Sequence, residues 1–251
     1  MPMTPMIASH RGGSYLWPEN SLLACRQTLA LGVEQLEIDV HAAADGEPVV
    51  MHDATLDRMT DTAGPVRALS AAALGAVRVR GTGGEPVPLL ADVAALLAGS
   101  AQGLRLEVKA DAEGRPYPGL VARSAAVLDA LGLRGRTLLM AFQPSDVTAA
   151  AGLGGFAGLV LLLEGRPWRG MGLPAAVALA RSCGATEIGL PLAELDQAAV
   201  AGLRQAGLAV SAWGANRAAD IARALELDLD AMTSDDPVRA LRMRGEWLLR
   251  R

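Results

Sequence analysis

The chain has 251 residues, of which 51% are apolar and 20% charged, and its formal net charge is −4 at pH 7. This length is enough for one sizeable hydrophobic core and lies at the upper end for a single domain. The mild acidity gives no electrostatic sign of nucleic-acid binding. We therefore expect one domain over residues 1–251 and no nucleic-acid partner.

The cysteines and the N-terminus bear on the cellular compartment. Cys25 and Cys183 are far apart in the sequence, which indicates free thiols in a reducing compartment. The N-terminus has no charged segment followed by a long apolar run, so we expect no signal peptide. The longest apolar stretch, residues 147–163, contains four glycines and is too short to span a membrane comfortably. These features predict a cytoplasmic protein without stable membrane insertion, and they leave the oligomeric state open.

Short apolar segments alternate with longer amphipathic segments that are rich in Ala and Leu. The apolar segments predict strands at residues 6–9, 35–40, 104–108, 137–142, 158–163, 186–190, 208–213 and 230–234. The amphipathic segments predict helices at 20–31, 117–131, 144–151, 174–183, 195–206, 216–226 and 236–249. Continuous apolar strands separated by helices are typical of a parallel sheet. In a chain of this length the pattern predicts an α/β fold, a (β/α)₈ TIM barrel, with an open doubly wound sheet as the main alternative.

One region departs from this alternation. Residues 53–90 contain no long periodic helix before Leu89, and we interpret them as a small insertion after the second strand. Before it, Asp45 and Gly46 predict a tight turn between two extended segments, so that the chain makes a hairpin-like excursion.

Charged residues interrupt or end the apolar strands at four places. They are His10 with Arg11, Glu37 with Asp39, His52 with Asp53, and Glu107 with Lys109. An unpaired charge is costly to bury, so a charged residue in an apolar strand is expected to have a partner or a functional role. The C-terminal ends of barrel strands form one rim, where active sites are built. We therefore expect these side chains to converge there.

The three carboxylates on these strands, Glu37, Asp39 and Glu107, predict a metal site. Oxygen ligands of this kind suit one divalent cation, Mg²⁺ or Ca²⁺, with Mn²⁺ as a further option. A cation would also relieve the repulsion between the carboxylates. The alternative is structural: such pairs often form salt bridges, and Lys109 is placed to pair with Glu107.

Imidazoles and cations complete a possible reaction site. His10 and His52 can act as general acid and base near neutral pH. Arg11 and Lys109, which is the chain's single lysine, suit a phosphate group. Together with a divalent cation, these groups describe phosphodiester cleavage. Each residue alone also has a structural interpretation, Arg11 as an ordinary surface arginine.

The same residues carry a family resemblance. The run IASHRGGSYLWPENSLLA resembles the opening of glycerophosphodiester phosphodiesterases of the cytoplasmic bacterial type, with its HR and PEN elements. EIDVHAAADGEPVVMHDATLDR resembles their ExD, DG and HD segment, and GEPVPLLADVAALL is similar to their next helix entry. LRLEVK resembles the ExK strand, while LMAFQPSD, VSAWGAN and MTSDDPVRAL resemble the last strands. The combination spans nearly the whole chain in the right order.

The resemblance implies a role for each of these residues. A divalent metal would be held by Glu37, Asp39 and Glu107, His10 and His52 would form the acid/base pair, and Arg11 and Lys109 would contact phosphate. Phe142 and Trp213 match aromatic positions that line the substrate pocket, with core packing as the alternative. Three further residues, Glu19, Asn20 and Asp53, would support the site. Glu19 would organise the metal or Arg11, and Asn20 is equally suited to cap a helix.

Some positions depart from the family pattern. Ala44 stands where a Thr is frequent, Gln143 follows Phe142, and the last strand ends in SDDP. None of these removes a predicted ligand or histidine. His41 matches no catalytic position, and because it alternates with Asp39 along the strand, it should share its face. We expect a supporting or structural role for it.

The resemblance implies metal-dependent hydrolysis of glycerophosphodiesters, such as glycerophosphocholine or glycerophosphoethanolamine, to glycerol 3-phosphate and an alcohol. The nucleophile would be water or the neighbouring glycerol hydroxyl. One alternative is a lipid phosphodiesterase, like lysophospholipase D or sphingomyelinase D, although no basic amphipathic helix for membrane docking is evident. The other alternative is a barrel that binds phosphodiesters without catalysis.

Overall fold

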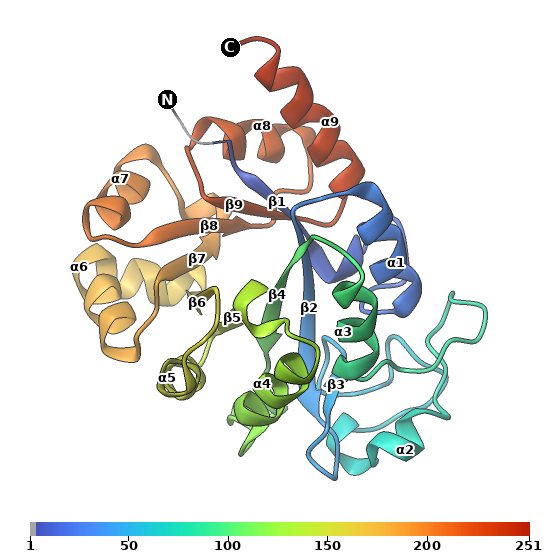
Figure 1. Ribbon diagram of the computed structural model, residues 1–251. Coiled ribbons are helices and arrows are strands. Elements are labelled where there is room, and N and C mark those ends of the chain that lie inside the picture. Colours follow the sequence, from blue (N-terminus) through green and yellow to red (C-terminus); the bar gives the residue numbers. More distant parts are fainter. Residues whose placement is uncertain (1–3) are drawn as a thin grey trace.

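The computed structural model describes residues 4–251, whose strands form a closed barrel (Figure 1). The strands are β1 (Met6–Ser9), β2 (Gln35–Ala42), β3 (Pro48–Val50), β4 (Gly103–Val108), β5 (Thr137–Ala141), β6 (Gly158–Leu162), β7 (Glu187–Pro191), β8 (Ala209–Trp213) and β9 (Ala231–Ser234). All except β3 are parallel to their neighbours, and β1 closes the barrel by pairing with both β2 and β9. The prediction of a (β/α)₈ TIM barrel is therefore confirmed.

Helices surround the barrel (Figure 1). They are α1 (Leu22–Leu31), α2 (Ala71–Leu74), α3 (Leu90–Ala98), α4 (Leu120–Ala130), α5 (Pro144–Leu153), α6 (Gly165–Cys183), α7 (Gln197–Gln205), α8 (Ala218–Glu226) and α9 (Pro237–Leu248). The main hydrophobic core lies between these helices and the strands, and Leu, Val and Ala supply most of it. Apart from α6, each predicted element has both ends within three residues of its prediction.

The expected insertion follows the antiparallel β3. Between β3 and α3 the chain forms mostly turns, together with the short helix α2. It has a small hydrophobic core of its own, which includes Leu56, Val66 and Leu74. The predicted turn at Asp45 and Gly46 joins β2 to β3, where Gly46 has a φ of 82°. Through this hairpin the chain returns toward the C-terminal rim of the barrel, where His52 follows β3.

Helix α6 corrects one prediction. The expected helix at 174–183 instead begins at Gly165 and is interrupted at Gly172, whose φ is 71°. Pro174, taken as the start, lies just beyond this kink. Glycine and proline have the lowest helix propensities, and the segment 165–172 contains three glycines and a proline. A helix was not expected there because its ordering comes from packing, with Trp168 buried in the main core.

A buried ion pair crosses the barrel interior. Arg105 on β4 donates to both carboxylate oxygens of Glu187 on β7, at 2.7 and 3.2 Å, and to Gln35 Oε1 on β2 at 2.6 Å. Arg105 has an exposed fraction of 1% and also lines the cavity at the C-terminal ends of the strands. The pair therefore joins three barrel strands beneath the candidate site.

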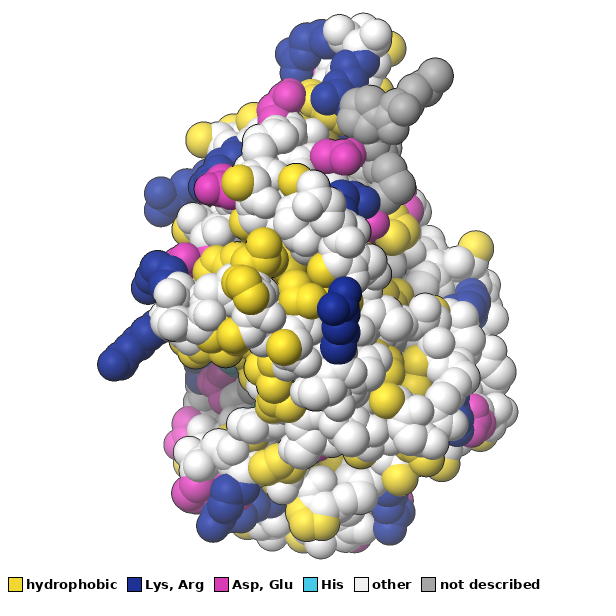
Figure 2. Space-filling view, turned by 90° about the vertical axis from the view of Figure 1, so that its left-hand side faces the viewer, with side chains coloured by type: hydrophobic (Ala, Val, Ile, Leu, Met, Phe, Trp, Pro, Cys, Tyr) yellow, Lys and Arg dark blue, Asp and Glu magenta, His cyan; other side chains and the backbone are white. Residues whose placement is uncertain are grey.

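Two surface properties bear on partners. Among the described residues, no helix is long and apolar enough to cross a membrane. On the face drawn in Figure 2, basic and acidic side chains lie in separate small groups around apolar ones. The described residues on this face form no continuous basic area.

Candidate active site

The turn after β1 places a cation at the rim. Arg11 adopts a left-handed conformation, with a φ of 52°, and Gly12 follows at 79°. A Cβ atom on Gly12 would lie 2.7 Å from the Cβ of Ala24, so both the conformation and the close approach require glycine. The turn directs the Arg11 backbone N–H at Glu37 Oε2, 2.8 Å away. Local strain of this kind is typical of functional sites.

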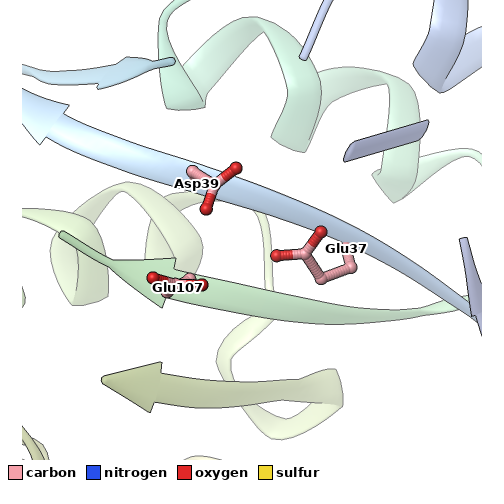
Figure 3. A group of neighbouring side chains, drawn as sticks. All are labelled: Glu37, Asp39 and Glu107. Carbon is pink, nitrogen blue, oxygen red and sulfur yellow. The ribbon is translucent and has the colours of Figure 1, made fainter. Parts of the chain in front are cut away.

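The three predicted metal ligands lie together at the C-terminal end of the barrel. Figure 3 shows Glu37 and Asp39 on β2 and Glu107 on the neighbouring β4, and one oxygen from each lies within 4.8 Å of the others. All three are buried. Glu37 Oε1 and Asp39 Oδ1 have no hydrogen-bond partner within the described residues. Buried carboxylate oxygens left in this way fit a divalent cation, which takes oxygen ligands.

The carboxylates of this acidic cluster and the cations around it shift one another's pKa values. Burial and the neighbouring Asp39 raise the pKa of Glu37 to about 8, and burial likewise raises the pKa of Glu107. Burial opposes ionisation of Asp39 as well, but Lys109 and other nearby cations lower its pKa overall. Lys109 Nζ lies 2.7 Å from Glu107 Oε1 and 3.3 Å from Asp39 Oδ1. Its ammonium therefore neutralises only part of the cluster, and a further cation would be stabilised there.

Asn20 holds one member of the cluster and does not cap the helix. It has a φ of 53°, its Nδ2 donates to Asp39 Oδ2 at 2.8 Å, and its Oδ1 accepts from the Asp39 backbone N–H at 3.3 Å. Helix α1 is capped by Ser21, whose Oγ accepts from the Ala24 backbone N–H. The structure therefore shows Asn20 in contact with a candidate ligand, and the helix cap that the sequence also allowed for it is supplied by Ser21.

His10 is held by a carboxylate from the opposite end of the chain. Its Nδ1 lies 2.5 Å from Asp235 Oδ1, which also accepts from Ser14 Oγ at 2.6 Å. Asn216 donates to the second oxygen of Asp235 at 2.5 Å and accepts from its backbone N–H. Sequence reasoning noted the SDDP segment but gave Asp235 no role. Its position directly after a strand was the available signal.

His52 is held by its neighbour in sequence. Its Nδ1 lies 2.7 Å from Asp53 Oδ1, and Arg58 donates to both oxygens of Asp53, at 2.7 and 3.0 Å. Arg58 also donates to Glu19 Oε1 at 2.7 Å, and Glu19 accepts from Arg11 at 3.2 Å. Glu19 thus organises Arg11, while Arg58, from the insertion, is a residue that the sequence did not single out.

The two histidines sit in different electrostatic surroundings. Burial disfavours a charge on His10, but its hydrogen bond with Asp235 and the nearby Glu37 raise its pKa overall. Burial, with Lys109 and Arg11 nearby, lowers the pKa of His52 against the attraction of Asp39.

One cavity of about 420 Å³ connects most of these groups. Its polar lining includes His10, Arg11, Glu37, His52, Glu107 and Lys109, and its apolar lining includes Met140, Phe142, Leu162 and Trp213. The two aromatic residues therefore line the same cavity as the candidate reacting groups. A cavity lined by both cations and apolar side chains suits a phosphate ester with a small organic substituent.

Comparison with protein families gives a match over most of the chain. The model of the glycerophosphoryl diester phosphodiesterase family matches residues 10–239. A curated glycerophosphodiester phosphodiesterase of Caldanaerobacter subterraneus is 24% identical over 243 residues, which cover 94% of this chain and 96% of that protein. A local match of 56 residues to glycerophosphodiester phosphodiesterase 1 of Bos taurus is 52% identical, and spans 22% of this chain and 17% of that protein.

Solved structures resemble the whole barrel. A crystal structure of a glycerophosphoryl diester phosphodiesterase of uncertain assignment from Agrobacterium tumefaciens has a TM-score of 0.94 and 29% identity, covering 98% of this chain and all of that one (100%). A phosphodiesterase from Oleispira antarctica, solved with the product sn-glycerol-3-phosphate, has a TM-score of 0.82 and 26% identity. It covers 96% of this chain and 97% of that one.

Proposed function

The chain belongs to the glycerophosphoryl diester phosphodiesterase family and is a phosphodiesterase; from this we propose that it hydrolyses glycerophosphodiesters to glycerol 3-phosphate and an alcohol. Glycerophosphocholine and glycerophosphoethanolamine are the substrates we would test first. One observation carries the proposal: two histidines, two cations and two carboxylates of the buried acidic cluster line a single cavity.

The substrate phosphate is held by Arg11 and Lys109 in this proposal. Arg11 Nε is buried without a hydrogen-bond partner among the described residues, although it lies 3.6 Å from Asp39 Oδ2. A guanidinium and an ammonium supply the charge that a diester phosphate needs on binding.

Glu37, Asp39 and Glu107 would hold one divalent cation, Mg²⁺ or Ca²⁺, with Mn²⁺ as a further option. When bound, such an ion polarises the phosphoryl oxygens and stabilises the charge that develops on them. The support comes from the buried oxygens without hydrogen bonds in this cluster. Asn20 would keep Asp39 oriented through its two hydrogen bonds.

His10 and His52 would serve as the acid/base pair. Each presents one ring nitrogen to a carboxylate, His10 to Asp235 and His52 to Asp53, which orients the ring and leaves Nε2 for proton transfer. One histidine takes the proton of the nucleophile and the other gives a proton to the leaving alcohol. Attack by the neighbouring glycerol hydroxyl would expel the alcohol, gain from proximity and leave a cyclic phosphate, which water would then open to glycerol 3-phosphate. Direct attack by water would expel the alcohol and give glycerol 3-phosphate in one step.

Phe142 and Trp213 would contact the organic part of the substrate. Both line the same cavity as the charged groups. Aromatic faces suit the carbon-bearing side of glycerol and, in a cationic alcohol such as choline, its ammonium group.

A product assay tests this function against the lipid alternative. We expect release of glycerol 3-phosphate from glycerophosphocholine, detected with a coupled enzyme, and much slower release of choline from lysophosphatidylcholine. The reverse preference would make the protein a lipid phosphodiesterase, and binding without turnover would make it a non-catalytic barrel.

The remaining expectations are part of the proposal. We propose a single domain over residues 1–251, a small-molecule substrate and no nucleic-acid partner, in keeping with the net charge of −4. A cytoplasmic location is supported by Cys25 and Cys183, which are both free and buried.

A further inference from the structure

His41 is a buried histidine that the proposed reaction does not use. It lies on β2 two residues beyond Asp39, with an exposed fraction of 1%. The cluster of candidate ligands in the described residues does not include it. Both of its ring nitrogens instead have partners: Nδ1 lies 3.0 Å from Tyr117 Oη, and Nε2 lies 3.0 Å from the backbone oxygen of His52.

The partners determine which nitrogen carries the proton. A backbone carbonyl only accepts hydrogen bonds, so Nε2 of His41 must donate to His52. In a neutral ring, Nδ1 is then an acceptor, and the Tyr117 hydroxyl donates to it. Burial raises the pKa of Tyr117 to about 12, so this hydroxyl keeps its proton. The chain of donors therefore runs from Tyr117 through His41 to the His52 carbonyl.

The backbone at His52 needs such a contact because it lies beyond the paired strand. Strand β3 ends at Val50, and Met51 makes the last backbone hydrogen bond to β2, its N–H donating to Asp39 at 3.1 Å. Within residues 4–251, the bond from His41 is the one hydrogen bond to the His52 carbonyl. The carbonyl of His10, in contrast, accepts from two backbone N–H groups of its own turn.

We propose that His41 is a positioning residue for His52, which it holds at the rim through the backbone while Asp53 orients the ring. This rests on the proposed function, in which His52 transfers a proton. Tyr117 fixes His41 in the tautomer that donates to His52, and the edge-to-face contact of the two rings, with centroids 5.6 Å apart, restrains the ring plane.

Kinetics of His41 variants test the role. His41→Phe keeps an aromatic ring but removes both hydrogen bonds, whereas His41→Gln retains a donor for the carbonyl and an acceptor for Tyr117. We expect His41→Phe to lower kcat about 10–100-fold, the usual loss for a residue that orients a reacting group, with KM changed less than about threefold. His41→Gln should recover most of the loss. An unchanged kcat in His41→Phe, or no recovery in His41→Gln, would overturn the proposal.

A second background separates positioning from general destabilisation. If His41 acts through His52, adding His41→Phe to His52→Ala should not lower the residual activity further. A further loss of the same size as in the wild-type background would show that His41 acts elsewhere.

Nuclear magnetic resonance of the unmodified protein tests the geometry without any activity. The chain has three histidines, so the ring nitrogens in a ¹⁵N-histidine sample can each be assigned. We expect Nε2 of His41 to carry a proton, and a ring with its proton on Nδ1 instead would contradict the contact with His52. If this tautomer is found but no diester is hydrolysed, the proposed function fails while the structural contact stands.

Discussion

His10 Nδ1 lies 2.5 Å from Asp235 Oδ1, although 225 positions separate the two residues in the sequence. The contact follows from closure of the barrel, because β1 pairs with β9 and both residues come directly after these strands. Ser14 and Asn216 fix the carboxylate from either side. The first and last strands thus jointly build one half of the candidate acid/base pair.

Asp235→Asn should lower kcat about 10-fold or more while leaving the fold intact. Asparagine keeps the shape but loses the charge that favours the protonated His10 and orients its ring. The measurement is steady-state turnover of glycerophosphocholine, with Ser14→Ala as a control that removes a neighbouring hydrogen bond and keeps the carboxylate. Equal losses in both variants would argue that the charge on Asp235 is unimportant.

His10→Ala and His52→Ala should each lose about 10²–10⁴-fold in kcat, the range expected for a general acid or base. Both side chains line the cavity and neither belongs to the main hydrophobic core, so melting temperatures should stay close to wild type. Turnover within a few-fold of wild type in either variant would remove that histidine from the mechanism.

Glu187→Ala should strongly destabilise the barrel. It leaves the Arg105 guanidinium, with its exposed fraction of 1%, without its ionic partner. Breaking a buried pair in this way costs about 3–5 kcal/mol of unfolding free energy, measured by denaturant titration. Glu47→Gln, which removes a surface partner of Arg123, is the control and should cost far less.

Replacing both members of the pair should undo much of that damage. In Arg105→Met with Glu187→Met, no buried charge remains, and the side chains keep a similar volume. A double variant that is less stable than Glu187→Ala would show that the hydrogen bond from Arg105 to Gln35 is the important contact.

Asp146→Asn should stabilise the protein in a pH-dependent manner. Burial raises the pKa of Asp146 to about 6, and its Oδ2 has no hydrogen-bond partner in the described residues. Because the folded-state pKa is raised, the stabilisation by the bound proton is complete below about pH 4 and is lost as the pH rises through about 6. The variant should therefore gain stability over wild type at pH 8 and little at pH 4. Denaturant titrations at both values check this, and a difference independent of pH would contradict it.

Most of the fold was predictable because each apolar strand and amphipathic helix has a local pattern. The first half of α6 was not, since residues 165–172 have low helix propensity and are ordered by packing. The start of helix α1 could not be assigned from the sequence, because Asn20 and Ser21 are both favourable N-cap residues. Only the geometry shows that Asn20 turns to Asp39 instead.

The candidate site was predictable where charged residues interrupt the apolar pattern of a strand. Glu37, Asp39 and Glu107 are buried charges in apolar segments, and this conflict marks them in the sequence alone. Asp235 and Arg58 were not identified, since their importance comes from contacts with His10 and Asp53 that the fold creates.

The most direct test of the account is a panel of glycerophosphodiesters, assayed for glycerol 3-phosphate with and without divalent cations. We expect turnover of at least one member with Mg²⁺, Mn²⁺ or Ca²⁺, loss of activity in excess chelator, and recovery when the ion returns. Full activity in excess chelator would contradict a metal role for the acidic cluster. No release of glycerol 3-phosphate from any member under any condition would contradict the proposed reaction.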